Sequence, residues 1–188
     1  MTAVLKMNIQ ELDTKFIEDL KHQFSSSEVE IYVHEKSTAR STLTIDDFWE
    51  MIGQLDWSNE GDDAAVVEPL IQLLEKRPLA HLYRFEALLA EKLWKLDTRN
   101  HASVFLENPE AGSLSVDDFL YTRCAVVANG KDFYQKVLNN PSEMPEDLTF
   151  EPLLYVTLHA YKRKTGKEFI FAPAHNYETY RNKKGWKK

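Results

Sequence analysis

The chain has 188 residues and a formal net charge of −7, with 43% hydrophobic and 28% charged residues. This is the composition of an ordinary globular protein, long enough to bury one sizeable core. No apolar run approaches the length of a membrane span, and the opening MTAVLKMNIQ lacks the apolar stretch of a signal peptide. Cys124 is the single cysteine, which excludes an intrachain disulfide. We therefore expect a cytoplasmic protein that does not enter membranes.

Residues 1–40 predict a small extension made of one helix and one strand. Asn8, with Glu11 three positions later, is typical of a helix start, because both side chains can bind free backbone N–H groups. The apolar residues that follow recur at helical spacing and are Ile9, Leu12, Phe16, Leu20 and Phe24.

The strand is expected in residues 28–35, EVEIYVHE. Val29, Ile31 and Val33 alternate with more polar residues, so they share one face of a half-buried strand. A lone helix and strand cannot bury both apolar faces. We therefore expect the extension to mediate homodimerisation, with these three side chains in the interface.

The main domain, from residue 44 to residue 188, is predicted to be a compact multi-helix domain, so that the fold class is mostly α. Thr44 with Asp47 is typical of the start of its first helix. Pro69 is expected to kink or divide the second helix, and Pro78 suits the first turn of the third. The third helix carries a core stripe of Leu79, Leu82, Phe85, Leu89, Leu93 and Leu96.

The stretch from Ser115 to Pro141 is the most informative part of the sequence. Ser115 marks the start of a helix and Asn129, followed by glycine, marks its end. Arg123 lies among apolar residues at helical spacing within it. A cation in such a place needs a partner or a ligand, because burying an unpaired charge costs much free energy.

The C-terminal part of the chain differs in charge from the rest. Residues 161–188 hold nine Lys or Arg and two acidic residues, whereas residues 1–160 hold 14 basic and 28 acidic ones. We expect a helix from about residue 150 to Gly166 and an irregular segment after it that wraps the body. We expect this segment to dock on the chain itself or to remain solvated, and not to bind nucleic acid, since the acidic body repels phosphate.

Five segments, in order, resemble the bacterial domain-of-unknown-function family 4240. They are FWEMIGQLDW, VVEPLIQLL, FLYTRCAVVANGKDFY, FEPLLYV and YETYRNKKGW. The resemblance covers about residues 44–186 and implies an α-rich fold, but it implies no activity, because that of the family is unassigned. The N-terminal LDTKFIEDLKHQFSSSEVEIYV also resembles the opening of small bacterial antitoxin-like proteins, in which a short helix–strand unit serves assembly.

Motifs of catalysis and cofactor binding are missing from the sequence. It has no Gly-rich phosphate loop and no nucleophile elbow, and its six histidines form no pair with metal-ligand spacing. A reactive thiol needs an electropositive and partly open setting, so we expect Cys124 to be a packed thiol. We expect no cofactor and no metal.

A polar cluster offers one candidate ligand site. Asp97, Arg99 and His101 follow a strongly apolar helix, and with Arg123 they would suit an anionic ligand, since arginine binds carboxylate or phosphate with two hydrogen bonds. The structural alternative is that Asp97 caps the next helix and that one of the arginines forms a buried salt bridge with Asp56 or Asp97.

Trp57 offers the second candidate, a protein interface. It lies in the acidic loop of residues 54–63, and a wide aromatic side chain beside a polar rim is typical of interfaces. The hypothesis that follows is a non-enzymatic protein-interaction module of the immunity or antitoxin kind. The alternative is a domain that binds a small anionic ligand, or an enzyme, that uses Asp97, Arg99, His101 and Arg123.

Overall fold

The computed structural model describes residues 12–25, 42–106 and 114–187. The chain divides into two compact units, residues 1–37 and residues 38–188. Within the described ranges all regular structure is helical, which confirms the mostly α fold class. The strand expected at residues 28–35, with Val29, Ile31 and Val33, lies outside the described residues, so the helix is the only element of the extension that the structure supports.

Helix α1, Thr14–Gln23, is the described element of the N-terminal unit. It begins later than the predicted start at Asn8, because Asp13 accepts a hydrogen bond from the backbone N–H of Phe16 at 2.7 Å and so caps the helix. None of its residues is buried, and Ile17 and Phe24 are exposed.

The body begins with α2 (Ile45–Ile52), α3 (Asp63–Lys76) and α4 (Leu79–Leu96). The predicted cap of α2 is present, since Thr44 Oγ1 accepts from the Asp47 backbone at 3.1 Å and an Asp47 carboxylate oxygen accepts from the Thr44 backbone at 2.8 Å. Helix α3 runs through Pro69 as one piece, so of the two expected effects, a kink or a division, the division is absent. The helix packs against α8.

The second half of the body contains α5 (Ser103–Leu106), α6 (Val116–Ala128), α7 (Lys131–Asn139) and α8 (Val156–Thr165). A 3₁₀ turn at Glu151–Tyr155 leads into α8. Gly166 ends α8 with a φ of 71°, a left-handed conformation that glycine adopts without strain. The remaining described residues, 167–187, form no helix longer than a turn.

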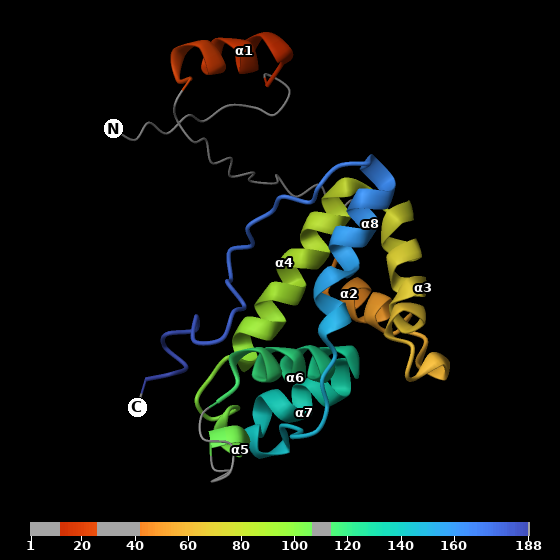
Figure 1. The fold of residues 1–188 in the computed structure, drawn as a ribbon, viewed down its shortest axis with the longest axis vertical. Helices are drawn as coiled ribbons and strands as arrows, with labels where there is room; N and C mark the ends of the chain where they lie inside the picture. The colour runs from red at the N-terminus through yellow and green to blue at the C-terminus, as the bar shows by residue number, and fades with distance from the viewer. Residues whose placement is uncertain (1–11, 26–41, 107–113, 188) are drawn as a thin grey trace. The chain divides into compact units, whose positions relative to one another are not determined.

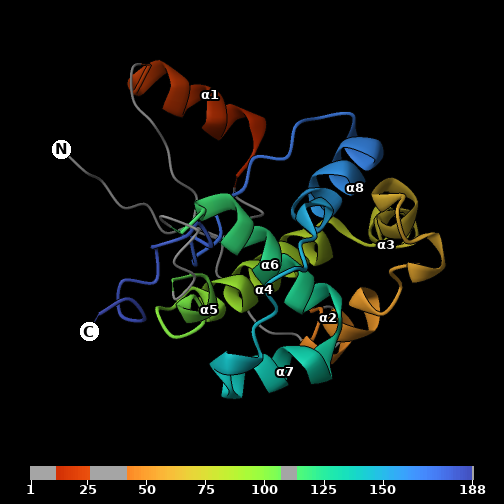
Figure 2. The ribbon, with the colours of Figure 1, turned by 60° about the horizontal axis from the view of Figure 1, so that its bottom comes forward.

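Helices α4 and α6 lie in the middle of the body (Figure 2), and α8 packs against α4 on one side and against α3 on the other (Figure 1). The C-terminal segment leaves the end of α8 and runs back beside α4 towards α6 (Figure 1). No helix in the described part of the chain is long and apolar enough to cross a membrane. The four largest fully buried side chains among the described residues come from α2, α4 and α6 and are Phe48, Phe85, Phe119 and Arg123.

Candidate functional site

Arg123 of α6 is fully buried, as its apolar sequence neighbours indicated. Its Nη1 donates to the carbonyls of Leu93 and Tyr177 at 3.0 and 2.9 Å, and its Nη2 donates to Thr179 Oγ1 at 2.9 Å. Its Nε donates to the carbonyl of Phe119 at 3.3 Å, and the guanidinium carbon lies 4.8 Å from the centre of the Phe119 ring. Carbonyl dipoles and an aromatic face therefore surround this cation.

Asp97, directly after α4, is a fully buried anion. One carboxylate oxygen accepts from the Tyr180 backbone at 3.0 Å and from Trp186 Nε1 at 2.8 Å. The other oxygen accepts from the Asn182 backbone at 2.8 Å. Three N–H donors thus replace the water that the carboxylate loses on burial.

Asp97 and Arg123 together hold residues 177–186, and we call the two side chains the C-terminal clamp. Burial lowers the pKa of Arg123 to about 10, and the negative charge of Asp97 acts in the opposite direction. Arg123 therefore stays charged at neutral pH. Among the described residues no carboxylate lies within 4.0 Å of its guanidinium, so a direct salt bridge is not how the charge is held.

Further contacts fix the backbone of the clamped residues. Thr179 Oγ1 donates to the Val116 carbonyl at 2.8 Å, and the Arg99 backbone donates to the Gly185 carbonyl at 3.0 Å. A Cβ atom at Gly185 would lie 2.7 Å from Thr98 Cγ2, so glycine is the residue that this close approach admits. The basic C-terminal segment is thus docked on the body, and a buried carboxylate anchors it rather than the acidic outer surface.

The other two residues of the predicted polar cluster have different surroundings. The side chain of Arg99 is exposed. His101 is buried, with Nε2 at 3.2 Å from the Val137 carbonyl and Nδ1 at 2.7 Å from Thr98 Oγ1. Because a carbonyl only accepts, Nε2 carries the hydrogen and Nδ1 accepts from the hydroxyl. Burial lowers the pKa of His101, and the Arg123 charge lowers it further, so the ring is neutral.

The four residues therefore do not converge on one open place. Asp97 and Arg123 bind the chain's own C-terminal segment, His101 binds the end of α7, and Arg99 faces solvent. An anionic ligand would reach the two buried charges only if residues 177–186 left the clamp.

Two further titratable groups, those of Cys124 and Glu86, are buried in the interior. Cys124 is fully buried, and burial raises the pKa of its thiol, so it remains protonated and packed. Glu86 on α4 is buried beside Thr157 of α8, and burial raises the pKa of its carboxyl group. The sequence analysis missed Glu86, although its place between Leu82 and Leu89 put it on the buried face of α4. Within the described ranges no three His, Cys, Asp or Glu side chains are grouped to hold a metal ion.

Trp57 lies in a 3₁₀ turn, Trp57–Asn59, between α2 and α3, and its place in a protein interface stays a prediction. Its side chain is 43% exposed, and its ring packs against Phe150 with 5.0 Å between ring centres. Beside it, Asp56 accepts hydrogen bonds from the Ser58 backbone at 3.1 Å and from Asn59 Nδ2 at 2.8 Å, and the bonds to Ser58 lower the Asp56 pKa most. Residues 45–63 contain seven acidic residues and no Lys or Arg, and we call the exposed side chains of this segment the Trp57 surface.

Comparison with known proteins identifies a family for most of this body. The family described as "Protein of unknown function (DUF4240)" matches residues 43–163, which include Trp57, Asp97 and Arg123. The segment YETYRNKKGW lies beyond the matched range, although the resemblance in the sequence extended to it. No curated protein and no solved structure matches the chain significantly. The match covers well over half of the chain, which therefore belongs to the DUF4240 family.

Proposed function

We propose that this protein is a non-enzymatic interaction module of the immunity or antitoxin kind, and that its Trp57 surface recognises a basic partner protein. The observation that carries the proposal is a half-exposed tryptophan in a segment with seven acidic residues and no Lys or Arg, in which Asp46 alone forms a salt bridge among the described residues, with Lys131 of α7. Tryptophan is enriched among the residues that contribute most to binding energy, and surrounding charges accelerate and orient association.

The support beneath Trp57 favours binding, because a preorganised side chain loses little entropy when a partner arrives. The ring rests on Phe150, and Asp56 closes the turn that carries it through its bonds to Ser58 and Asn59. The acidic side chains of α2 and of the loop extend this surface: Asp46, Asp47, Glu50, Glu60, Asp62 and Asp63.

The interior supports a binding role over a catalytic one. Asp97, Arg123 and His101, which are the polar groups best suited to chemistry, all have hydrogen-bond partners inside the chain. The alternative, an anionic-ligand site or an enzyme that uses these residues with Arg99, requires release of the C-terminal segment. We also propose homodimerisation through the N-terminal extension, where α1 exposes Ile17 and Phe24.

Affinity capture with the full chain tests the proposed function. We expect one stoichiometric partner of high isoelectric point from the lysate of the native cell, bound less tightly as salt rises. Replacing Trp57 with alanine (Trp57→Ala) should weaken the purified complex at least about tenfold, since central tryptophans contribute about 2 kcal/mol or more.

Leu106→Ala is the matched control, because Leu106 is 42% exposed and lies outside the Trp57 surface. Light scattering of the same samples reports the oligomeric state. Unchanged affinity for Trp57→Ala would remove the proposed interface, and a monomer at all concentrations would remove the proposed homodimer.

A further inference from the structure

A second exposed surface lies at the end of α8, in the loop of residues 167–171. Phe169 stacks on Tyr83 of α4 with 5.5 Å between ring centres and an angle of 25°, and it packs on Tyr161 of α8 at 5.1 Å. Phe171 packs on Tyr83 at 5.3 Å. These rings attach the loop to the first turns of α4 and the last turns of α8. We call residues 167–171 the apolar tip.

The apolar tip presents an aliphatic side chain to solvent. Ile170 is 90% exposed and Phe171 is 37% exposed, whereas Phe169, directly before them, is partly buried. Since the neighbouring rings hold the backbone, Ile170 is displayed and not folded back against the protein. Exposure of adjacent large apolar residues on a supported loop marks a contact site.

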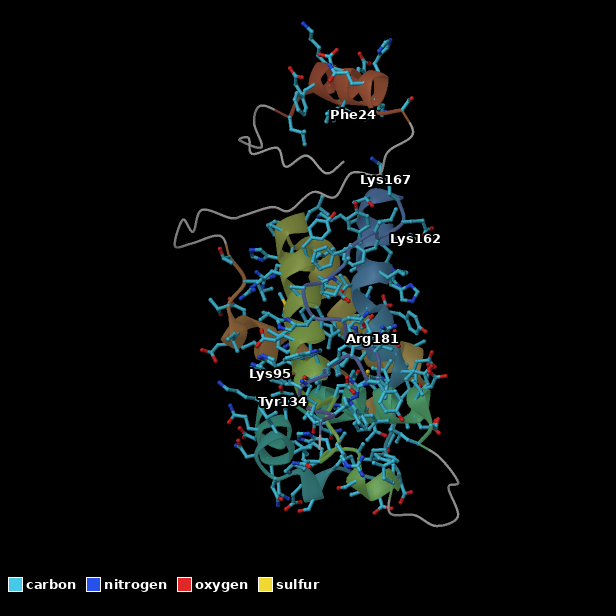
Figure 3. The ribbon with its side chains drawn as sticks, turned by 90° about the vertical axis from the view of Figure 1, so that its left-hand side faces the viewer. Phe24, Lys95, Tyr134, Lys162, Lys167 and Arg181 are labelled. Carbon is cyan, nitrogen blue, oxygen red and sulfur yellow. The ribbon has the colours of Figure 1, made fainter. Side chains whose placement is uncertain are left out.

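Basic side chains surround the tip. Lys162, Lys164 and Lys167 are exposed at the end of α8, and Figure 3 shows Lys162 and Lys167 at this end of the helix. The neighbouring anion, Glu168, lies 3.1 Å from Lys162, and Lys164 Nζ donates to the Glu75 carbonyl at 3.0 Å. Both contacts are exposed to solvent, so they are weak and the ammonium groups can exchange them for an anionic partner.

The distribution of charge indicates which kind of partner the apolar tip would bind. The net charge of the chain is −7, so cations gathered around exposed apolar residues form a local exception. At physiological salt, charges interact over about 8 Å, so the acidic Trp57 surface does not cancel an attraction that acts at the tip. An anionic partner fits this place.

We propose that the apolar tip binds an anionic lipid surface from the aqueous side, with Ile170 and Phe171 in the headgroup region and the three lysines against lipid phosphates. A side chain that is 90% exposed has no walls around it, which suits insertion into a fluid apolar layer. The aromatic rings stack on one another, so they are less suited to stacking on nucleic-acid bases. Anionic headgroups attract basic segments over a short range.

Sedimentation of the full chain with vesicles tests the proposal. We expect binding to vesicles of phosphatidylcholine mixed with phosphatidylglycerol, little binding to phosphatidylcholine alone, and loss of binding at high salt. Ile170→Asp and Lys167→Glu should each reduce the bound fraction at low protein occupancy by about tenfold.

Two matched variants serve as controls. Leu148→Asp changes an aliphatic side chain that is 48% exposed outside both proposed binding surfaces, and Lys136→Glu changes an exposed lysine on α7; both should bind like the unchanged protein. Thermal unfolding confirms that each variant is folded. The proposal is overturned if the unchanged protein ignores anionic vesicles, if Ile170→Asp binds them normally, or if a single-stranded oligonucleotide abolishes vesicle binding through the same residues.

Discussion

The two halves of the C-terminal segment contrast with each other. Residues 177–186 and the apolar tip, residues 167–171, both lack a helix beyond a single turn. The first half is anchored by polar bonds to the buried charges of Asp97 and Arg123, and the second is attached by aromatic rings at the surface. The contrast shows that irregular backbone becomes a fixed part of a fold where charged groups from the core satisfy its N–H and C=O groups.

The largest expected effect comes from Arg123→Met, which tests the anchored half. The change would leave the carbonyls of Leu93 and Tyr177 and the hydroxyl of Thr179 without their donor. We expect a loss of about 3 kcal/mol or more in the free energy of unfolding, measured with urea, because each buried unsatisfied group costs about 1–3 kcal/mol.

Arg123→Lys is the companion variant. It keeps a charge but lacks the planar fork that reaches three acceptors at once, so it should recover only part of the loss. Asp97→Asn removes the negative charge of the same clamp. It should make the peptide bonds around Tyr180 accessible to proteases. Stabilities within about 0.5 kcal/mol of the unchanged protein would show that the clamp does not hold this half.

A smaller effect on the free energy of unfolding is expected when the pH is lowered. The pKa of buried His101 is lowered, so below the ordinary value of 6.5 the unfolded chain binds more protons at this site than the folded chain does. Stability should therefore fall as pH drops below about 6.5. His101→Gln should flatten this part of a stability–pH curve recorded by urea unfolding, and an unchanged curve would contradict the assignment.

The smallest expected effect belongs to the apolar tip. Ile170→Ser removes a side chain that contacts almost nothing in the protein, so stability should stay within about 0.5 kcal/mol. Urea unfolding of Ile170→Ser and of Arg123→Met under the same conditions compares their free energies of unfolding directly. A loss as large as that of Arg123→Met would mean that Ile170 belongs to the packed structure, and the contrast between the halves would fail.

Local signals in the sequence predicted much of the fold. The cap formed by Thr44 and Asp47, the ends of α6, the stop of α8 at Gly166 and the burial of Arg123 all depend on neighbours within a few positions. Such neighbours are readable along the chain, because caps and helical faces have fixed spacings.

The partners of the buried charges could not be predicted in this way. Arg123 binds Tyr177 and Thr179, which follow it by 54 and 56 positions, and two of its acceptors are helix carbonyls that every residue has. Asp97 binds backbone N–H groups 83 and 85 positions away. Backbone groups carry no sequence signature, so only the folded arrangement reveals these bonds. The start of α1 was misjudged for a different reason, since Asp13 is the better cap.

The clamp also has a consequence for the order in which this protein acquires its structure. Synthesis runs from the N-terminus, so Asp97 and Arg123 leave the ribosome well before the residues that neutralise their polarity. Until Trp186 has emerged, a nascent helical body must keep both charges in water instead of closing over them. Residues 177–186, which are made after Asp97 and Arg123, thus determine when water can be excluded from the interior.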